Sequence, residues 1–102
     1  MALSKCRCVY AIVNKKNGKM YVGSTGNLRK RSYEHKSKLR NNYHRNQLLQ
    51  DAYNKYGKEN FEFKILEKVK NEEKLSKVEH KYVEGEKANR KKLYNGWGVL
   101  NH

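Results

Sequence analysis

The sequence predicts a small α+β domain, in which a mainly antiparallel sheet of three strands is flanked by helices in the order ββααβα. Residues 6–13, 20–23 and 61–66 are rich in side chains that favour strands, and the first and last of these runs repeat with a period of two. Apolar residues recur at helical spacing in three other segments. The chain has 102 residues, of which 36% are hydrophobic, so we expect residues 1–102 to form a single domain around one small core.

The first two strands are expected to form a hairpin. The polar residues between them include Asn17-Gly18, a dipeptide that favours tight hairpin turns because both residues tolerate positive φ angles. A third strand is indicated where large apolar side chains take every second position, at Phe61, Phe63 and Ile65. Each strand is therefore expected to turn one face toward the core.

Two helices are expected between the second and third strands. Asn27 can cap a helix over residues 28–39, because its side chain can accept a hydrogen bond from the first backbone N–H groups. The next helix is expected over residues 46–56, and Gly57 follows it in the position where a glycine commonly ends a helix.

A third helix is expected from Asn71 to about residue 85, with acidic residues at the positive end of its dipole. The tail from residue 87 onward is basic and then apolar. Its glycines predict a loop, and Trp97 and Leu100 predict that this loop packs on the core.

The charge of the chain predicts a polyanionic partner. Lys and Arg number 24 and Asp and Glu number 10, which gives a net charge of +14. Each cation that neutralises a phosphate releases counterions, so nucleic acid is the first candidate. An anionic membrane surface is the rival, but it favours a basic amphipathic helix or a lipid anchor, and the sequence has neither. With no long apolar segment and no signal peptide, we expect a soluble, cytoplasmic protein.

The cysteines and histidines do not favour a disulfide or a zinc site. Cys6 and Cys8 lie two residues apart in an extended segment, where the geometry of a disulfide is not available. The spacing of the four histidines does not provide the ligand pattern of zinc.

Several polar side chains fall on faces that the periodicity assigns to the core. Arg31 and His35 lie in one helical stripe with Leu28 and Leu39, and Glu79 lies beside the apolar stripe of the third helix. Burial of such groups is unfavourable unless they have partners. An ion pair at the edge of the core, or a solvated helix flank, is the alternative to a functional role.

Two tyrosines of the predicted hairpin have the same ambiguity. Tyr10 points to the face opposite that of Val9 and Ala11, and the hairpin brings Tyr21 alongside it. Their hydroxyl groups need hydrogen-bond partners if they are buried. Filling of a small core by aromatic rings is the alternative interpretation.

The hairpin resembles the two signature tripeptides of the GIY-YIG nuclease family. Cys8-Val9-Tyr10 corresponds to the first tripeptide and Tyr21-Val22-Gly23 to the second. Cys8 replaces the glycine of the first motif, which restricts the backbone there but does not affect the chemistry. The resemblance covers nearly the whole chain, through Ser24-Thr25, Asn27-Leu28, Arg31, His35, His44-Arg45-Asn46, Gln50-Asp51-Ala52, Lys55-Tyr56-Gly57, residues 61–67, Glu79 and Tyr94-Asn95.

The resemblance implies a divalent-metal-dependent DNA endonuclease that hydrolyses phosphodiester bonds with one Mg²⁺ or Mn²⁺ ion per active site. It implies that Glu79 binds the metal and that Arg31 neutralises charge on the attacked phosphate. Tyr10, helped by His35 or Tyr21, would activate the attacking water.

Two further residues receive supporting roles from the resemblance. His44 would position a phosphate or a water, and an ordinary surface histidine is the alternative. Asn95 would order the site through hydrogen bonds, and Asn101 competes with it for this role.

Other functional features follow from the charge and the length of the chain. Lys19, Lys30 and Arg45 are candidates for contacts with DNA phosphates. The sequence holds no helix-turn-helix or zinc finger, so we expect little intrinsic sequence specificity. Substrate structure, nicking or double-strand cleavage and oligomeric state stay open, and a dimer or a targeting partner is compatible with the sequence.

Two other functions also stay open: a non-catalytic nucleic-acid-binding module that keeps the same fold, and a small RNA-binding protein of the ribosomal type. Neither has a use for the full set of Tyr10, Tyr21, Arg31, His35 and Glu79.

Overall fold

A computed structural model describes residues 5–87, 93 and 94 of the chain. The elements follow the predicted order ββααβα, with two short 3₁₀ turns added. Their bounds are β1 (Cys8–Asn14), β2 (Met20–Thr25), α1 (Leu28–Arg40), α2 (Gln47–Tyr56), η1 (Lys58–Asn60), β3 (Phe61–Lys68), η2 (Glu72–Lys74) and α3 (Leu75–Lys87).

The three strands form one antiparallel sheet in the order β2-β1-β3, which confirms the predicted sheet. Tyr10 of the central strand lies opposite Gly23 of β2 and Ile65 of β3. A register shift between Val9 and Tyr10 interrupts the pairing with β3. The turn between β1 and β2 contains Gly18 with a φ of 77°, whereas Asn17 has a negative φ. The predicted hairpin is therefore present, but its turn is longer than a two-residue turn and is closed by hydrogen bonds from Asn14 to Lys19 and from Gly18 to Asn14.

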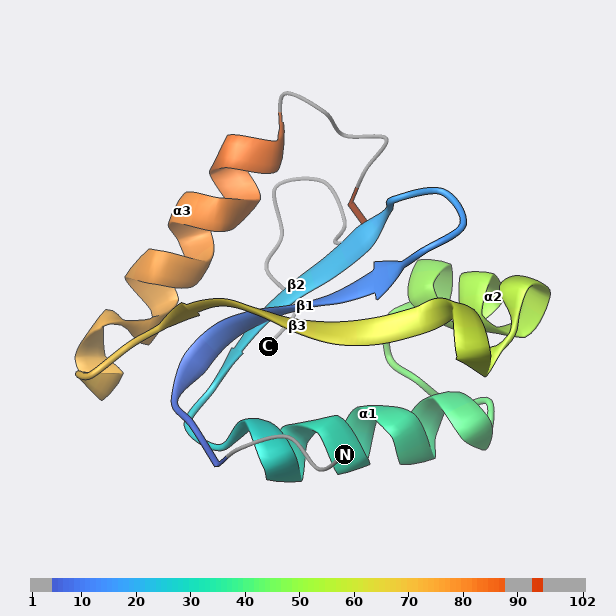
Figure 1. Ribbon diagram of the computed structural model, residues 1–102, viewed down its shortest axis with the longest axis horizontal. Helices are drawn as coiled ribbons and strands as arrows, with labels where there is room; N and C mark the ends of the chain where they lie inside the picture. The colour runs from blue at the N-terminus through green and yellow to red at the C-terminus, as the bar shows by residue number, and fades with distance from the viewer. Residues whose placement is uncertain (1–4, 88–92, 95–102) are drawn as a thin grey trace.

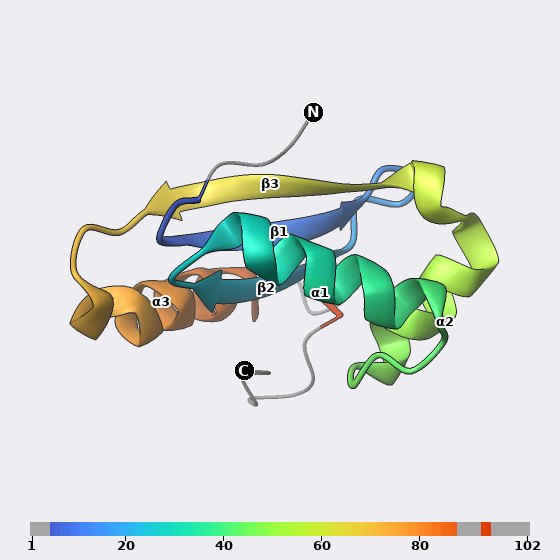
Figure 2. The same ribbon diagram turned by 90° about the horizontal axis from the view of Figure 1, so that it is seen from below.

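The helices cover both faces of the sheet, so the core has two layers. Figures 1 and 2 show α1 on one side of the strands and α3 on the other. Tyr10 and Ile12 of β1 belong to a buried cluster together with residues of α1 and α2. Val9 of β1 belongs to a second cluster with Leu75 and Val83 of α3. The predicted alternation along the first strand is therefore confirmed, because neighbouring residues pack into the core layers on opposite faces of the sheet.

The helix caps follow the sequence closely. The Asn27 side chain accepts a hydrogen bond from the backbone N–H of Lys30 and caps α1. Asn46 likewise caps α2 and precedes the helix, although we expected Asn46 to be its first residue. Gly57 ends α2 with a φ of 91°, as predicted.

The third helix begins later than predicted. The segment that follows Asn71 forms the 3₁₀ turn η2, and α3 starts only at Leu75. Asn71 accepts a hydrogen bond from the backbone N–H of Glu73, so it caps this turn and not the α-helix. The first strand is also shorter at its start than predicted, because Cys6 uses its carbonyl to accept the backbone N–H of Leu28 and does not pair in the sheet.

The chain returns to the sheet at Tyr94. Leu93 forms a parallel bridge with Met20, and the backbone N–H of Tyr94 donates to the carbonyl of Met20. The Tyr94 ring is buried in the cluster of α1 and α2. The predicted contacts of Trp97 and Leu100, and the proposed roles of Asn95 and Asn101, lie outside the described residues.

Cys6 and Cys8 are free thiols, as the sequence predicted. In the part of the chain that the structure describes, no helix has the length and apolar character needed to cross a membrane.

Gly23 leaves room for the Tyr10 ring to lie over the edge strand. A Cβ atom at Gly23 would stand 2.6 Å from the Tyr10 hydroxyl oxygen and 2.7 Å from Cζ. These distances are far inside van der Waals contact, and Tyr10 is buried, so the ring has little freedom to move away.

We therefore expect Gly23→Ala to lower the free energy of unfolding by about 1–3 kcal/mol, as overpacking of a core does. Gly26→Ala is the matched control, because its added Cβ meets only the Glu72 carboxylate, at 3.9 Å. Urea unfolding of the two variants measures the difference. Equal stability of both variants would contradict the close contact between Gly23 and Tyr10.

Candidate active site

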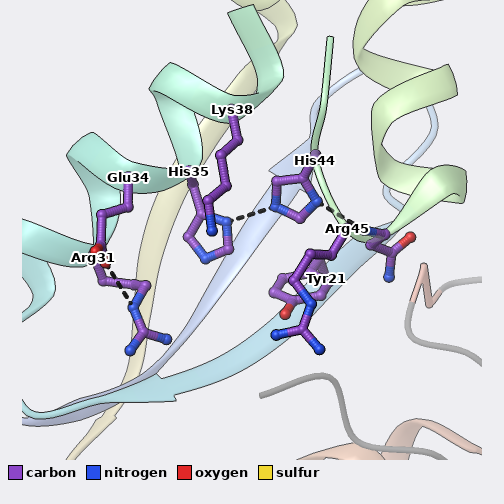
Figure 3. Close-up of a pocket in the computed structure, with 8 residues that line it drawn as sticks. Tyr21, Arg31, Glu34, His35, Lys38, His44 and Arg45 are labelled. Carbon is purple, nitrogen blue, oxygen red and sulfur yellow. Dashed lines mark hydrogen bonds and ion pairs between the residues drawn. The ribbon is translucent and has the colours of Figure 1, made fainter. Parts of the chain in front are cut away.

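A cavity of about 230 Å³ opens between β2, α1 and the loop that joins α1 to α2. Figure 3 shows its side chains, which come from three separate segments of the chain. The cavity is lined by Tyr21, Arg31, Glu34, His35, Lys38, His44, Arg45 and Asn46. Its walls are therefore aromatic and mostly cationic.

A chain of three hydrogen bonds runs from this loop into the core. The backbone N–H of Asn46 donates to Nδ1 of His44, with an N to N distance of 3.0 Å. Nε2 of His44 lies 2.8 Å from Nδ1 of His35, and Nε2 of His35 lies 2.6 Å from the hydroxyl oxygen of Tyr10. The planes of the two imidazole rings differ by 20° and their centroids are 5.0 Å apart, so the rings meet edge to edge through this hydrogen bond. His44 is thus buried and is not a surface histidine.

The direction of this chain follows from its first bond. A nitrogen that accepts a hydrogen bond carries no proton, so neutral His44 has its proton on Nε2. That N–H donates to Nδ1 of His35, which leaves the proton of neutral His35 on Nε2. His35 therefore donates to Tyr10, and the hydroxyl oxygen of Tyr10 is an acceptor. In this tautomer His35 cannot take a proton from Tyr10.

Both histidines are held in the neutral form that this chain requires. Burial lowers the pKa of His35 to about 3, and His44 and Arg31 act in the same direction. Burial also lowers the pKa of His44, and Lys38 adds to the effect. Neither ring is therefore charged at neutral pH.

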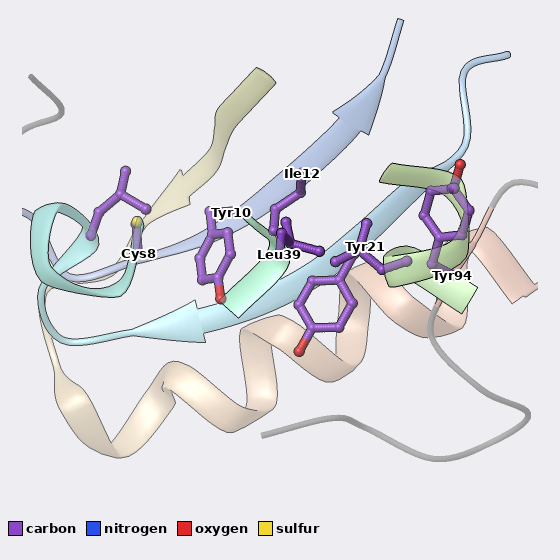
Figure 4. Close-up of a cluster of buried hydrophobic side chains, with 9 residues drawn as sticks. Cys8, Tyr10, Ile12, Tyr21, Leu39 and Tyr94 are labelled. Carbon is purple, nitrogen blue, oxygen red and sulfur yellow. The ribbon is translucent and has the colours of Figure 1, made fainter. Parts of the chain in front are cut away.

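Tyr10 and Tyr21 form a pair of buried phenols beside the histidines. Figure 4 shows their hydroxyl groups pointing the same way from neighbouring strands. Burial, and then Tyr21, raises the pKa of Tyr10 above its ordinary value, whereas Arg31 lowers it. Burial raises the pKa of Tyr21 to about 12. Glu79 raises the pKa of both phenols, which indicates that its carboxylate lies near them. Both phenols are protonated at neutral pH in the protein alone.

Two amide side chains hold the loop that carries His44. The backbone N–H of His44 donates to Oε1 of Gln50 at 3.0 Å, and Nε2 of Gln50 donates to the carbonyl of Leu39 at 2.9 Å. Nδ2 of Asn46 donates to the carbonyl of Tyr94 at 2.9 Å. Gln50 and Asn46 are both buried. They fasten the loop to the end of α1 and to the returning chain.

Glu79 reaches the edge strand from the opposite face of the sheet. Its side chain is 1% exposed, and the hydroxyl of Ser24 on β2 donates to Oε1. Oε2 is buried and has no hydrogen-bond partner among the described residues. A buried carboxylate oxygen in this state is unfavourable unless it has a function or a ligand.

The free carboxylate oxygen of Glu79 is the type of ligand that a hard divalent cation prefers. Mg²⁺ is typically held by one or two carboxylates and keeps waters and substrate phosphate as its other ligands. A buried carboxylate with one unpartnered oxygen supplies such a ligand. Among the residues described, no three His, Cys, Asp or Glu side chains cluster closely enough to hold a metal by themselves.

Arg31 lies at the edge of the cavity and not in the buried stripe where we expected it. The stripe consists of Leu28, Ser32, His35 and Leu39, so Ser32 takes the position that we assigned to the arginine. The Arg31 side chain is 37% exposed, and its Nε pairs with Glu34 at 3.2 Å. The difference arises because Ser32 and His35, four and seven positions after Leu28, face the sheet more directly than Arg31, which is three positions after it.

The predicted DNA-contact residues lie in three different places. Arg45 lines the cavity. Lys30 borders a shallow hollow at the start of α1, which Arg31 also lines. Lys19 lines a separate hollow between the hairpin turn and α2, beside Tyr94. Arg45 and Lys30 therefore each share a hollow with predicted catalytic residues, whereas the hollow beside Lys19 is lined by none of them.

Three residues that build the site had no predicted role. Ser24 holds Glu79, and Asn46 and Gln50 hold His44. Ser24 follows the second tripeptide and alternates with Val22 on the face that α3 covers, so the period of the strand could have found it. The roles of Asn46 and Gln50 depend on the path of a loop, which no periodic pattern encodes.

A sequence profile of the GIY-YIG catalytic domain matches residues 6–95. The chain belongs to the GIY-YIG family. This confirms the resemblance seen in the hairpin and the later motifs. No curated protein matches the sequence.

Solved structures are similar to this GIY-YIG domain over most of its length. The catalytic domain of the homing endonuclease I-TevI has a TM-score of 0.72 and 30% identity, over 78% of this chain and 86% of that chain. The catalytic domain of the intron endonuclease I-TevI with a Glu-to-Ala substitution has a TM-score of 0.81 and 26% identity, over 95% of this chain and 97% of that chain. The chain thus carries a nuclease domain fold of this family.

The buried histidines predict that acid weakens the GIY-YIG domain. Between about pH 6.5 and pH 3 the unfolded chain binds a proton at residue 35 that the folded chain excludes, so the free energy of unfolding falls as the pH falls. One such proton contributes at most about 1.4 kcal/mol per pH unit. His35→Gln should flatten this dependence in denaturant titrations, whereas exposed His80→Gln should leave it unchanged. An equal slope in wild type and His35→Gln would contradict the neutral, buried imidazole.

Proposed function

We propose that the chain is a divalent-metal-dependent DNA endonuclease that hydrolyses phosphodiester bonds with one Mg²⁺ or Mn²⁺ ion per active site. Membership of the GIY-YIG family supports the nuclease activity. One observation carries the metal dependence: the buried Glu79 carboxylate, held by Ser24, keeps one oxygen without a partner among the described residues. The same carboxylate raises the pKa of Tyr10 and of Tyr21, so it lies near both phenols.

Glu79 binds the metal ion in this proposal. Ser24 orients the carboxylate by donating to Oε1 and leaves Oε2 for the cation. A bound ion would supply polarisation of the attacked phosphate and stabilisation of charge on the leaving oxygen. Burial of the carboxylate excludes water from one side and strengthens its attraction for a cation.

Arg31 binds the attacked phosphate. Its guanidinium is permanently charged, and the ion pair with Glu34 uses Nε. The pair fixes the plane of the guanidinium, so the terminal nitrogens can meet two phosphate oxygens at once. A phosphate held in this way gains negative charge in the transition state, and Arg31 stabilises that charge.

Tyr10 takes the proton of the attacking water at its hydroxyl oxygen, after its own phenolic proton has passed to a solvent water and left a phenolate. The N–H of His35 donates to this oxygen and stabilises the phenolate more than the neutral phenol. Burial opposes ionisation, and Arg31 favours it. Tyr21 lies beside His35, with ring centroids 5.5 Å apart, and helps to order the water. His35 and His44 are therefore donors that prepare an acceptor, not bases themselves.

The DNA backbone is the partner that the basic surface binds. Lys30 and Arg45 flank the cavity and are proposed to contact phosphates, and Lys19 is proposed to contact the duplex farther away. Phosphate contacts carry no sequence information, so we expect low intrinsic sequence specificity. A dimer, or a partner that selects the target, would supply specificity or cleavage of the second strand.

Glu79→Gln tests this function, because the amide keeps the size of the side chain and its contact with Ser24 but removes the negative charge. We expect Mg²⁺-dependent nicking of supercoiled DNA to fall at least about a hundredfold, since the metal supplies several kcal/mol of transition-state stabilisation. DNA affinity in the absence of metal, measured by fluorescence anisotropy, should stay within about threefold of wild type.

Glu84→Gln is the control on the same helix, where the carboxylate is exposed and pairs with His80 on the surface. It should keep full activity. Retained cleavage by Glu79→Gln would refute the assignment of the metal ligand. A wild-type protein that binds DNA but cuts none in Mg²⁺ or Mn²⁺ would instead be a non-catalytic binding module.

A further inference from the structure

Three cations line the candidate active-site cavity, and one phosphate does not account for all of them. Arg31 and Lys38 belong to the same helix and are seven residues apart, which is about 10 Å along its axis. Arg45 comes from the loop after α1. Figure 3 shows the guanidinium groups of Arg31 and Arg45 at opposite ends of the cavity, with Lys38 between them.

The electrostatic effects of these cations overlap, but they differ at His44. Besides the effect of burial, Arg31 lowers the pKa of Tyr10, both arginines lower that of Tyr21, and Arg31 and Lys38 lower that of His35. Lys38 and Arg45 both lower the pKa of His44, at the other end of the hydrogen-bond chain. Lys38 and Arg45 therefore both act at the His44 end of the cavity, and about 10 Å of helix lies between Lys38 and Arg31.

The rest of the lining leaves this end positively charged. His35 and His44 are neutral at neutral pH, and the phenol of Tyr21 is protonated. Glu34 is the acidic residue in the lining, and it pairs with Nε of Arg31. A liquid water molecule takes roughly 30 Å³, so the cavity of about 230 Å³ has room for several waters or for a phosphate group with part of its sugar.

We propose that Lys38 and Arg45 form a second phosphate subsite, which binds the phosphate next to the one that is cut. This proposal rests on the proposed nuclease function and names how the substrate lies in that site. One DNA strand crosses the cavity, with the attacked phosphate at Arg31 and its neighbour between Lys38 and Arg45. The neighbouring phosphate sets the register of the strand, so the subsite acts on substrate binding and placement and not on the bond-breaking step.

Oligonucleotides with a single uncharged methylphosphonate linkage test the subsite bond by bond. In wild type, cleavage of the phosphodiester on one side of the neutral linkage should fall about tenfold, because a charge-assisted contact is lost. More distant bonds in the same oligonucleotide should be cut normally and serve as the internal reference.

The double variant Lys38→Gln with Arg45→Gln should cut fully charged DNA less efficiently, mainly because its KM is higher. Its cleavage rate should no longer depend on whether the neighbouring linkage is neutral. Lys36→Gln with Arg40→Gln is the matched control. It removes one lysine and one arginine from the same helix, where they line a different hollow. This control should keep the wild-type response. An unchanged response in the Lys38 and Arg45 variant would overturn the proposal.

A second measurement does not depend on cleavage. Inorganic phosphate titrated into wild type or Glu79→Gln should shift the ring resonances of His44 saturably, and the Lys38 and Arg45 variant should bind at least about fivefold more weakly. The absence of a saturable shift in wild type would overturn the subsite. If phosphate binds as expected but no DNA is cut, phosphate binding by Lys38 and Arg45 stands and the nuclease proposal fails.

Discussion

The candidate site depends on one chain of hydrogen bonds with a fixed direction. The backbone N–H of Asn46 determines which nitrogen of His44 is bare, and through His35 this decides that Tyr10 accepts a hydrogen bond at its hydroxyl oxygen. The donor at the start is a main-chain amide that cannot reverse its role. Because the rings of His35 and His44 are buried and neutral, the order of donors and acceptors is set before any substrate binds.

The edge strand β2 lets groups from both faces of the sheet meet. Tyr10 lies on the face covered by α1, whereas Glu79 comes from α3 on the other face. Gly23 has no side chain to collide with the Tyr10 ring, so the phenol lies against the backbone of β2. Ser24, the next residue, points to the opposite face and holds Glu79. Two consecutive residues therefore have different roles: Gly23 lets the Tyr10 ring lie against β2, and Ser24 holds the Glu79 carboxylate.

The sequence was sufficient for the order of elements, because each strand and helix repeats its pattern over several residues. It also identified Glu79 and His35 as polar groups in the core, since each lies on or beside an apolar stripe. The predicted start of α3 was wrong because Asn71 can cap a 3₁₀ turn as well as an α-helix. The direction of the hydrogen-bond chain could not be predicted, because it depends on how a loop without periodicity aims the amide of Asn46.

The tautomers of His35 and His44 decide whether Tyr10 accepts a hydrogen bond from His35. Proton–nitrogen correlation spectra at neutral pH distinguish the protonated from the bare nitrogen of each imidazole ring in the protein without metal or DNA. We expect neutral rings with the proton on Nε2 in both His35 and His44. A proton on Nδ1 of either ring, or a charged ring, would reverse or break the chain and remove the reason why Tyr10 is an acceptor.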